Sequence, residues 1–223
     1  MPLRKQTGNM YEFVNYTWNP IKGACIHDCV YCYMKKWGTP PPLRLHDDEL
    51  KTDLGRGKFI FVGSGTDMFA SNVPVEDIDA VLEVCRHYPE NQYLFQSKNP
   101  GRFEIFAGWY PPKCIFGTTI ETNREHGISK APPMIDRAEA MEGLIDEGCT
   151  TMVTIEPILD FDLHELVYLI ERCEPSWVNI GADSKGNNLP EPDAGKVAML
   201  KTALEEHGIK VLSKKNLNRL DRR

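Results

Sequence analysis

The sequence lacks the long apolar run that a membrane-spanning helix needs. No stretch of the 223 residues approaches the roughly 20 consecutive apolar residues that cross a bilayer, and the polar start of the chain lacks the apolar segment of a signal peptide. We therefore expect a cytoplasmic protein. Hydrophobic residues make up 41% of the chain and charged residues 26%, a balance typical of folded proteins rather than disordered ones. The length suits one domain with a sizeable core, so we expect residues 1–223 to form a single domain.

The chain also lacks an excess of positive charge. Its net charge of −6 argues against a broadly cationic protein that binds nucleic acid without specificity. Cations gather in residues 214–223, where five of them stand against one acid, a balance of +4 that leaves −10 for the rest of the chain. We expect this short basic C-terminal tail to supply any local contact with phosphate.

The cysteines are few and odd in number, which favours reduced thiols over a disulfide framework. Four of the seven are scattered singly among apolar residues, and we expect them to be small core side chains: Cys85, Cys114, Cys149 and Cys173. The other three, Cys25, Cys29 and Cys32, lie within eight residues.

The cysteine triplet has no fourth cysteine close to it in the sequence. A structural zinc site uses four protein ligands, whereas three thiolates can hold a cluster of four irons and leave one iron open to a small ligand. The spacing therefore favours an iron–sulfur site. Two alternatives remain open: zinc binding completed by His27 or a distant cysteine, and three buried thiols without a chemical role.

Short apolar runs alternate with amphipathic helical segments along the chain. Strands are expected near residues 13–17, 59–62, 93–95, 114–120, 152–155, 177–180 and 209–212. Helices are expected near residues 74–85, 134–145, 163–170 and 197–204, with glycines placed to end the second and fourth. Such alternation predicts a parallel sheet wrapped by helices. Because a complete eight-stranded barrel takes about 250 residues, we expect an open, partial parallel β/α barrel of six or seven strands.

Polar residues follow the expected strands, at the end where β/α barrels gather their chemistry. This ring consists of the cysteine loop and residues 63–67, 97–99, 121–123, 156, 183–184 and 214–215. Gly63 and Gly65 would let a ligand approach the backbone closely. Every strand of a barrel is followed by a loop, and loops are usually polar. Each residue of the ring can therefore be explained either by function or by a structural role, such as a salt bridge at the barrel mouth.

The cysteine spacing, with Tyr31 just before the last cysteine, resembles the signature of the radical S-adenosylmethionine (radical SAM) enzymes. Further segments extend the resemblance over most of the chain: residues 17–20, 61–69, 97–100, 117–121, 155–157 and 178–181. Together they are similar to the motifs of a little-characterised phage- and prokaryote-borne radical SAM family, which is distantly similar to spore photoproduct lyase.

The resemblance implies that Cys25, Cys29 and Cys32 ligate a 4Fe-4S cluster, whose open iron is chelated by SAM. An external electron donor of flavodoxin or ferredoxin type would reduce the cluster. Cleavage of SAM would then give methionine and a 5′-deoxyadenosyl radical, which abstracts a hydrogen atom from a substrate.

The resemblance also implies which residues surround SAM. The turn after the second strand would receive the methionyl amino group, Tyr31 would lie near the adenine, and Lys98 would pair with the methionyl carboxylate. The full set of expected SAM-binding residues is Tyr31, Gly63, Ser64, Gly65, Thr66, Lys98, Thr119, Glu121 and Asn123. The expected substrate contacts are Asp67, Glu156, Asp183 and Lys214.

The chain departs from spore photoproduct lyase at Val62, near the position where the lyase has its hydrogen-donating cysteine. Repair of a DNA lesion by that mechanism is therefore not expected. By analogy with the family, a nucleotide or nucleic-acid base is the favoured substrate over an amino acid or peptide. The alternatives to an enzyme are an iron–sulfur redox sensor and a zinc-binding interaction module.

Overall fold

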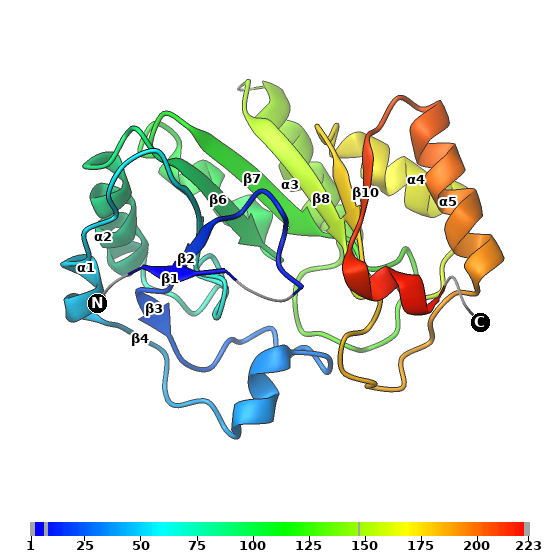
Figure 1. The fold of residues 1–223 in the computed structure, drawn as a ribbon, viewed down its shortest axis with the longest axis horizontal. Helices are drawn as coiled ribbons and strands as arrows, with labels where there is room; N and C mark the ends of the chain where they lie inside the picture. Colours follow the sequence, from blue (N-terminus) through cyan, green and yellow to red (C-terminus); the bar gives the residue numbers. More distant parts are fainter. Residues whose placement is uncertain (1–2, 7–8, 147, 221–223) are drawn as a thin grey trace.

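A mixed eight-stranded sheet runs through the computed structural model, which describes residues 3–6, 9–146 and 148–220 (Figure 1). Its strand order is β1-β2-β5-β6-β7-β8-β9-β10, with bounds β1 Arg4–Lys5, β2 Tyr16–Trp18, β5 Phe59–Val62, β6 Gln92–Ser97, β7 Cys114–Thr119, β8 Thr150–Ile155, β9 Val178–Ile180 and β10 Val211–Ser213. From β2 onward every neighbouring pair is parallel, whereas β1 joins β2 antiparallel at the edge. The sheet is not closed, and the predicted partial parallel β/α barrel is confirmed.

Helices cover the outer face of this sheet (Figure 1). The long ones are α2 Val75–Arg86, α3 Met134–Asp146, α4 Leu163–Arg172 and α5 Ala194–Glu206, and the short ones are α1 Asp47–Leu50 and the 3-10 helices η1 Tyr33–Trp37, η2 Pro100–Arg102, η3 Glu104–Phe106 and η4 Lys215–Arg219. All four long helices lie where the apolar spacing predicts them. None of the described helices is long and apolar enough to span a bilayer.

The two faces of the sheet carry different side chains, because successive residues of a strand point to opposite sides. The outward residues of the strands, such as Ile60, Phe95 and Val153, join the helices in the main core. The inner face begins with a small apolar cluster that includes Phe61 and Leu94. Farther along β6, β7 and β8, the polar residues Gln96, Thr119 and Thr154 are linked by hydrogen bonds to one another or to the Tyr11 hydroxyl.

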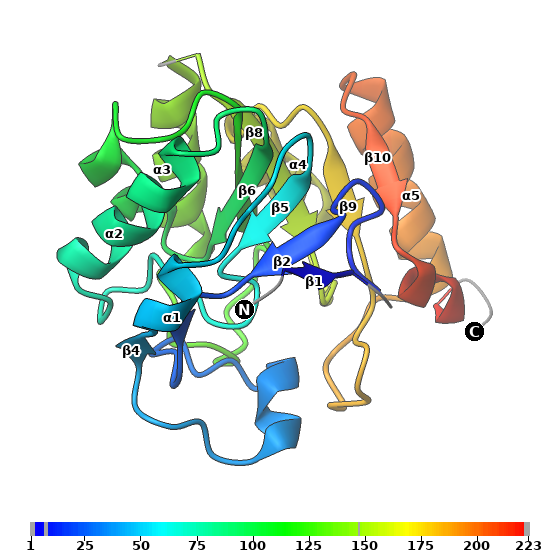
Figure 2. The same cartoon turned by 60° about the vertical axis from the view of Figure 1, so that its left-hand side comes forward.

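The first strand begins later than the sequence pattern suggests. Residues 13–15 are not part of β2, because Phe13 packs edge-on against Trp177, with ring centroids 5.2 Å apart, and also against Phe59 at 5.0 Å. Tyr11 inserts its hydroxyl between β6 and β8. Residues 9–14 thus cover the open side of the barrel, and Figures 1 and 2 show this dark blue segment crossing toward β10.

The cysteine segment lies between β2 and α1 and projects from the carboxyl end of the sheet (Figure 2). A two-stranded hairpin of β3 Ile21–Lys22 and β4 Arg44–Leu45 holds its base. Both this hairpin and β1 are absent from the sequence prediction, since strands of two residues carry no readable periodicity.

Candidate active site at the carboxyl end of the barrel

The three clustered cysteines are free thiols on one loop. Cys29 is buried, whereas Cys25 and Cys32 are partly exposed. The segment before α3 runs along this loop, with Val30 N donating to Ile128 O at 2.8 Å. It also places Ser129 Oγ 3.2 Å from Cys29 Sγ. Ser129 was not predicted as a site residue, because it lies 100 residues after Cys29 in the sequence and belongs to no recognisable motif.

The thiols are close along the chain without being gathered around a common point. Among the described residues, no three His, Cys, Asp or Glu side chains are already arranged as metal ligands. Burial, and then the nearby charge of Asp67, raise the pKa of Cys25 to about 11. A bound cation would offset this cost of ionising the thiol, since metal ligation requires the thiolate. Three free thiols on a projecting loop are a donor set that fits an iron–sulfur cluster.

His27 ties the cysteine loop to the barrel. Its side chain is only 4% exposed, and its Nε2 lies 2.8 Å from Asp67 Oδ2. Asp67 also accepts hydrogen bonds from Ser97 Oγ at 2.9 Å and from Lys98 N at 2.8 Å. Burial alone would raise the pKa of Asp67, but the hydrogen bond and charge of His27 outweigh it and lower this pKa. Asp67, a predicted substrate contact, therefore has its acceptor atoms occupied by the protein.

The glycine turn after β5 has the backbone shape that the sequence suggested. Gly63 has a φ of +76°, which favours glycine. Asn19 holds the turn through its Oδ1, which accepts from Gly65 N at 2.7 Å and from Ser64 Oγ at 3.2 Å. Thr66 Oγ1 donates to a loop carbonyl, Gly23 O, at 3.1 Å. The segment at residues 17–20 thus supports the turn that follows the next parallel strand.

A buried carboxylate, Glu121, joins two other predicted SAM-binding residues, Tyr31 and Lys98. It is 1% exposed and accepts from Lys98 Nζ at 2.7 Å, from Arg137 Nη1 at 2.9 Å and from the Tyr31 hydroxyl. Burial alone would raise its pKa, but the charges of Lys98 and Arg137 outweigh it and lower the pKa to about 2. Tyr31 is affected in the opposite direction, because burial, followed by the charge of Glu121, holds the pKa of its hydroxyl well above the usual value.

Arg137 was missed by the sequence reasoning. It lies on α3, which was interpreted from its apolar stripe alone, yet its side chain is buried and also donates to Thr119 O at 2.9 Å and Pro132 O at 2.7 Å. An arginine within an otherwise apolar helix face was the signal that could have revealed it, since buried arginines are almost always paired.

Two other expected SAM-binding residues are held by the protein itself. Thr119 Oγ1 accepts from Gln96 Nε2 at 3.2 Å inside the barrel. Asn123 receives the backbone N–H of Asp162 at 2.8 Å on its Oδ1, at the start of α4. Their assignment to SAM stays a prediction.

A second, part-buried ion pair lies at the barrel mouth. Lys214 Nζ donates to Glu156 Oε2 and lies 4.6 Å from the centroid of the Tyr11 ring. Asn9 Nδ2 and Asn216 Nδ2 each donate to Glu156 Oε1 at 2.8 Å. The structure thus brings together two of the predicted substrate contacts, Glu156 and Lys214.

A side chain at Gly181 would crowd this pair. A Cβ atom on Gly181 would lie 2.8 Å from the carboxyl carbon of Glu156 and 3.0 Å from Asn216 Oδ1. Asp183 lies two residues after Gly181 and bonds within its own loop. Its carboxylate accepts hydrogen bonds from Lys185 N at 3.0 Å and from Asn187 Nδ2 at 2.7 Å. Asp183 therefore shapes its own loop.

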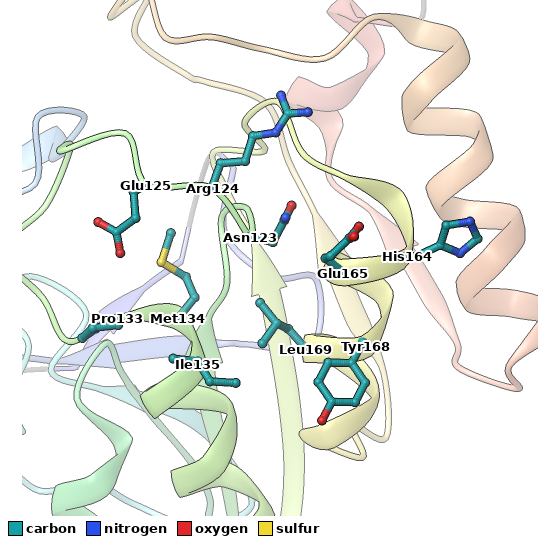
Figure 3. A pocket seen from close by; sticks show the side chains of 10 residues that line it. All are labelled: Asn123, Arg124, Glu125, Pro133, Met134, Ile135, His164, Glu165, Tyr168 and Leu169. Carbon is teal, nitrogen blue, oxygen red and sulfur yellow. The ribbon is translucent and has the colours of Figure 1, made fainter.

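A surface cavity of about 450 Å³ lies outside the barrel, between the starts of α3 and α4 (Figure 3). Met134, Ile135 and Leu169 give it an apolar floor, and Tyr168 stands at its side. Of the predicted site residues only Asn123 lines it. The cavity thus meets the predicted polar ring at Asn123.

A family model matches residues 9–215, over nearly the whole chain, and is described as "Protein of unknown function (DUF5131)". This chain belongs to that family. No curated protein matches it.

Two solved structures of radical SAM enzymes share its fold. A spore photoproduct lyase mutant superimposes with a TM-score of 0.69 at 13% identity, covering 93% of this chain and 79% of the lyase. SuiB of Streptococcus suis, bound to S-adenosylmethionine, gives a TM-score of 0.61 at 11% identity, covering 88% of this chain and 49% of SuiB. At these identities the likeness shows the fold, and it confirms the fold-level relationship that the sequence motifs indicated.

Proposed function

We propose that this protein is a radical SAM enzyme in which Cys25, Cys29 and Cys32 hold a 4Fe-4S cluster. When bound, the cluster supplies the electron that cleaves SAM to methionine and a 5′-deoxyadenosyl radical, which abstracts a hydrogen atom from a substrate. The observation that carries the proposal is the position of the three free thiols, on one loop at the carboxyl end of a barrel with the radical SAM fold.

The residues around Glu121 are suited to bind SAM. The Lys98 ammonium has three N–H donors, so it can keep its 2.7 Å contact with Glu121 and also donate to the methionyl carboxylate. Glu121 would fix the position of Lys98 and of the Tyr31 hydroxyl, which leaves the ring of Tyr31 to contact the adenine. The turn at residues 63–66 presents backbone groups to the methionyl amino group.

Among the residues predicted to contact substrate, Lys214 is the best candidate, because its ammonium has three N–H donors and its contact with Glu156 uses one of them. We propose a nucleotide or nucleic-acid base as the substrate class. A lyase mutant has been solved with AdoMet and dinucleoside spore photoproduct, which supports this class by analogy, whereas SuiB has been solved with the precursor peptide SuiA, which makes a peptide the alternative.

Anaerobic reconstitution tests the proposal. We expect about four irons per chain, and 5′-deoxyadenosine and methionine after addition of SAM and dithionite. The Cys29→Ala variant should lose the cluster and keep the fold by circular dichroism. Cys85→Ala, which removes a thiol buried in the main core, is the matched control and should keep the cluster.

Three outcomes separate the alternatives. Stoichiometric zinc without charge-transfer absorption indicates an interaction module. A cluster without SAM cleavage indicates a redox sensor. Loss of the cluster in Cys85→Ala to the same extent as in Cys29→Ala refutes the ligand assignment.

A further inference from the structure

Large apolar side chains are unusually exposed on the cysteine loop. Four of the ten exposed large hydrophobic residues in the described part of the chain lie within residues 26–37, and Trp37 is the most exposed of all at 74%. We define the cysteine-loop face as Ile26, Val30, Tyr33, Lys35, Lys36 and Trp37. Exposed apolar side chains that gather on one segment, with aromatics among them, favour a surface that binds a partner.

The cysteine-loop face is also locally basic in an acidic protein. Lys36 Nζ lies 4.5 Å from the centroid of the Trp37 ring, and Lys35 and Lys130 both pair with one exposed carboxylate, Asp28. Three lysines against one aspartate leave a positive surface, whereas the whole chain carries −6.

This face lies directly beside the expected cluster ligands. Ile26 and Val30 each follow a cysteine, and Cys32 caps η1, the helix that carries Lys35 to Trp37. Electron transfer between proteins slows steeply with distance. A partner bound to this face would therefore place its redox centre nearer to the thiols than one bound elsewhere.

We propose that the cysteine-loop face docks an acidic electron carrier of the flavodoxin type. This inference rests on the proposed function, and it assigns the site where the reductant binds. The acidic rim around the flavin of such a carrier complements Lys35 and Lys36, and the flat apolar edge of the flavin matches Trp37. The fully reduced flavin loses one electron and the cluster gains it, with no other group transferred. Charge attraction of this kind raises the association rate and weakens with salt.

The test uses the cluster-loaded protein and a purified acidic flavodoxin. In the double variant Lys36→Glu with Trp37→Ala, the dissociation constant for flavodoxin at low salt should rise at least about tenfold, because tryptophan is a typical hot-spot residue and Lys36→Glu reverses a charge that faces an acidic partner. The rate of cluster reduction by reduced flavodoxin, followed by the loss of charge-transfer absorption, should fall by a similar factor at subsaturating flavodoxin. Reduction by dithionite, which needs no docking, should be unchanged.

A matched control changes the same residue types at the opposite end of the sheet. Lys210 directly precedes β10. The guanidinium of Arg86, the last residue of α2, lies over the ring of Trp109. The double variant Lys210→Glu with Trp109→Ala alters the net charge equally and should bind flavodoxin within about twofold of the wild type.

Several results would overturn this docking site. The first is that flavodoxin does not bind the wild type at low salt. The second is that the control variant loses as much affinity for flavodoxin as the Lys36→Glu, Trp37→Ala variant. The third is that an acidic ferredoxin, and not flavodoxin, binds in a way that depends on the cysteine-loop face. Self-association that disappears in the Trp37 variant would instead assign the face to a second copy of the chain. If dithionite drives SAM cleavage in all variants but the changes in the cysteine-loop face do not alter flavodoxin binding, the docking site alone is refuted. If dithionite drives none in the wild type, the proposed function fails.

Discussion

Replacement of Glu121 by glutamine should destabilise the protein and also change how its stability depends on pH. The carboxylate is 1% exposed and is paired with Lys98 and Arg137, of which Arg137 is only 2% exposed on its side chain. Glutamine keeps the shape of the side chain and one acceptor oxygen, but it removes the negative charge that pairs with Lys98 and Arg137. Breaking a buried pair from one side costs about 3 to 5 kcal/mol.

The pKa of Glu121 gives an independent magnitude. A pKa lowered from 4.5 to about 2 corresponds to about 3 kcal/mol of stability. Because the pKa is lower in the folded state, this contribution is fully present above pH 4.5 and is lost as the pH falls toward 2. We therefore expect Glu121→Gln to be about 3 kcal/mol less stable than the wild type at pH 7, and the difference to shrink steadily below pH 4.5.

Urea unfolding of the metal-free protein at a series of pH values measures both effects. Asp48→Asn is the matched control, because Asp48 is paired with Lys51 on the surface, where both side chains are largely exposed, and its loss should cost less than about 1 kcal/mol. A loss below 1 kcal/mol in Glu121→Gln, or a difference that does not vary between pH 7 and pH 2, would refute the reasoning.

Three further outcomes follow from the site. Lys98→Met should weaken SAM binding by about 1.5 to 3 kcal/mol in calorimetry and leave the cluster absorption intact, whereas unchanged affinity would make Lys98 a purely structural partner of its carboxylate. Gly181→Ala should lower the unfolding free energy by about 1 to 3 kcal/mol, because its Cβ would lie 2.8 Å from the Glu156 carboxyl carbon, and wild-type stability would contradict this crowding. Asn19→Ala should loosen the glycine turn and weaken SAM binding several-fold while secondary structure is retained, and an unchanged dissociation constant would separate the turn from the SAM site.

Much of the fold was accessible from local sequence patterns. The run at residues 59–62 is β5 to the residue, and the apolar spacing places α2 and α4 within a few residues of their observed ends. These patterns are readable because buried strands and amphipathic helices impose periods of 2 and 3.6 residues on the chain itself. The segment at residues 13–17 was less predictable, since the aromatic Phe13 fits a strand and a loop that packs against the barrel equally well.

The candidate site divides in the same way. The cysteine spacing and the positions of Lys98, Glu121, Glu156 and Lys214 at strand ends were readable, because parallel strands bring their carboxyl ends to one edge of the sheet. Which charges pair with one another was not readable. Lys98 was expected to pair with the methionyl carboxylate, and it contacts Glu121. Glu156 and Lys214 were expected to contact substrate or to form a salt bridge at the barrel mouth, and they pair with each other.

The sequence by itself determined the layered architecture and the residues that reach the barrel mouth, because both depend on spacings of a few residues along the chain. The tertiary structure alone decided the partners. Ser129 beside Cys29, Arg137 beside Glu121 and Asn9 beside Glu156 are brought together from distant segments, in the last case across 147 residues. Such contacts depend on how helices and loops pack over the whole sheet, and no local period encodes them.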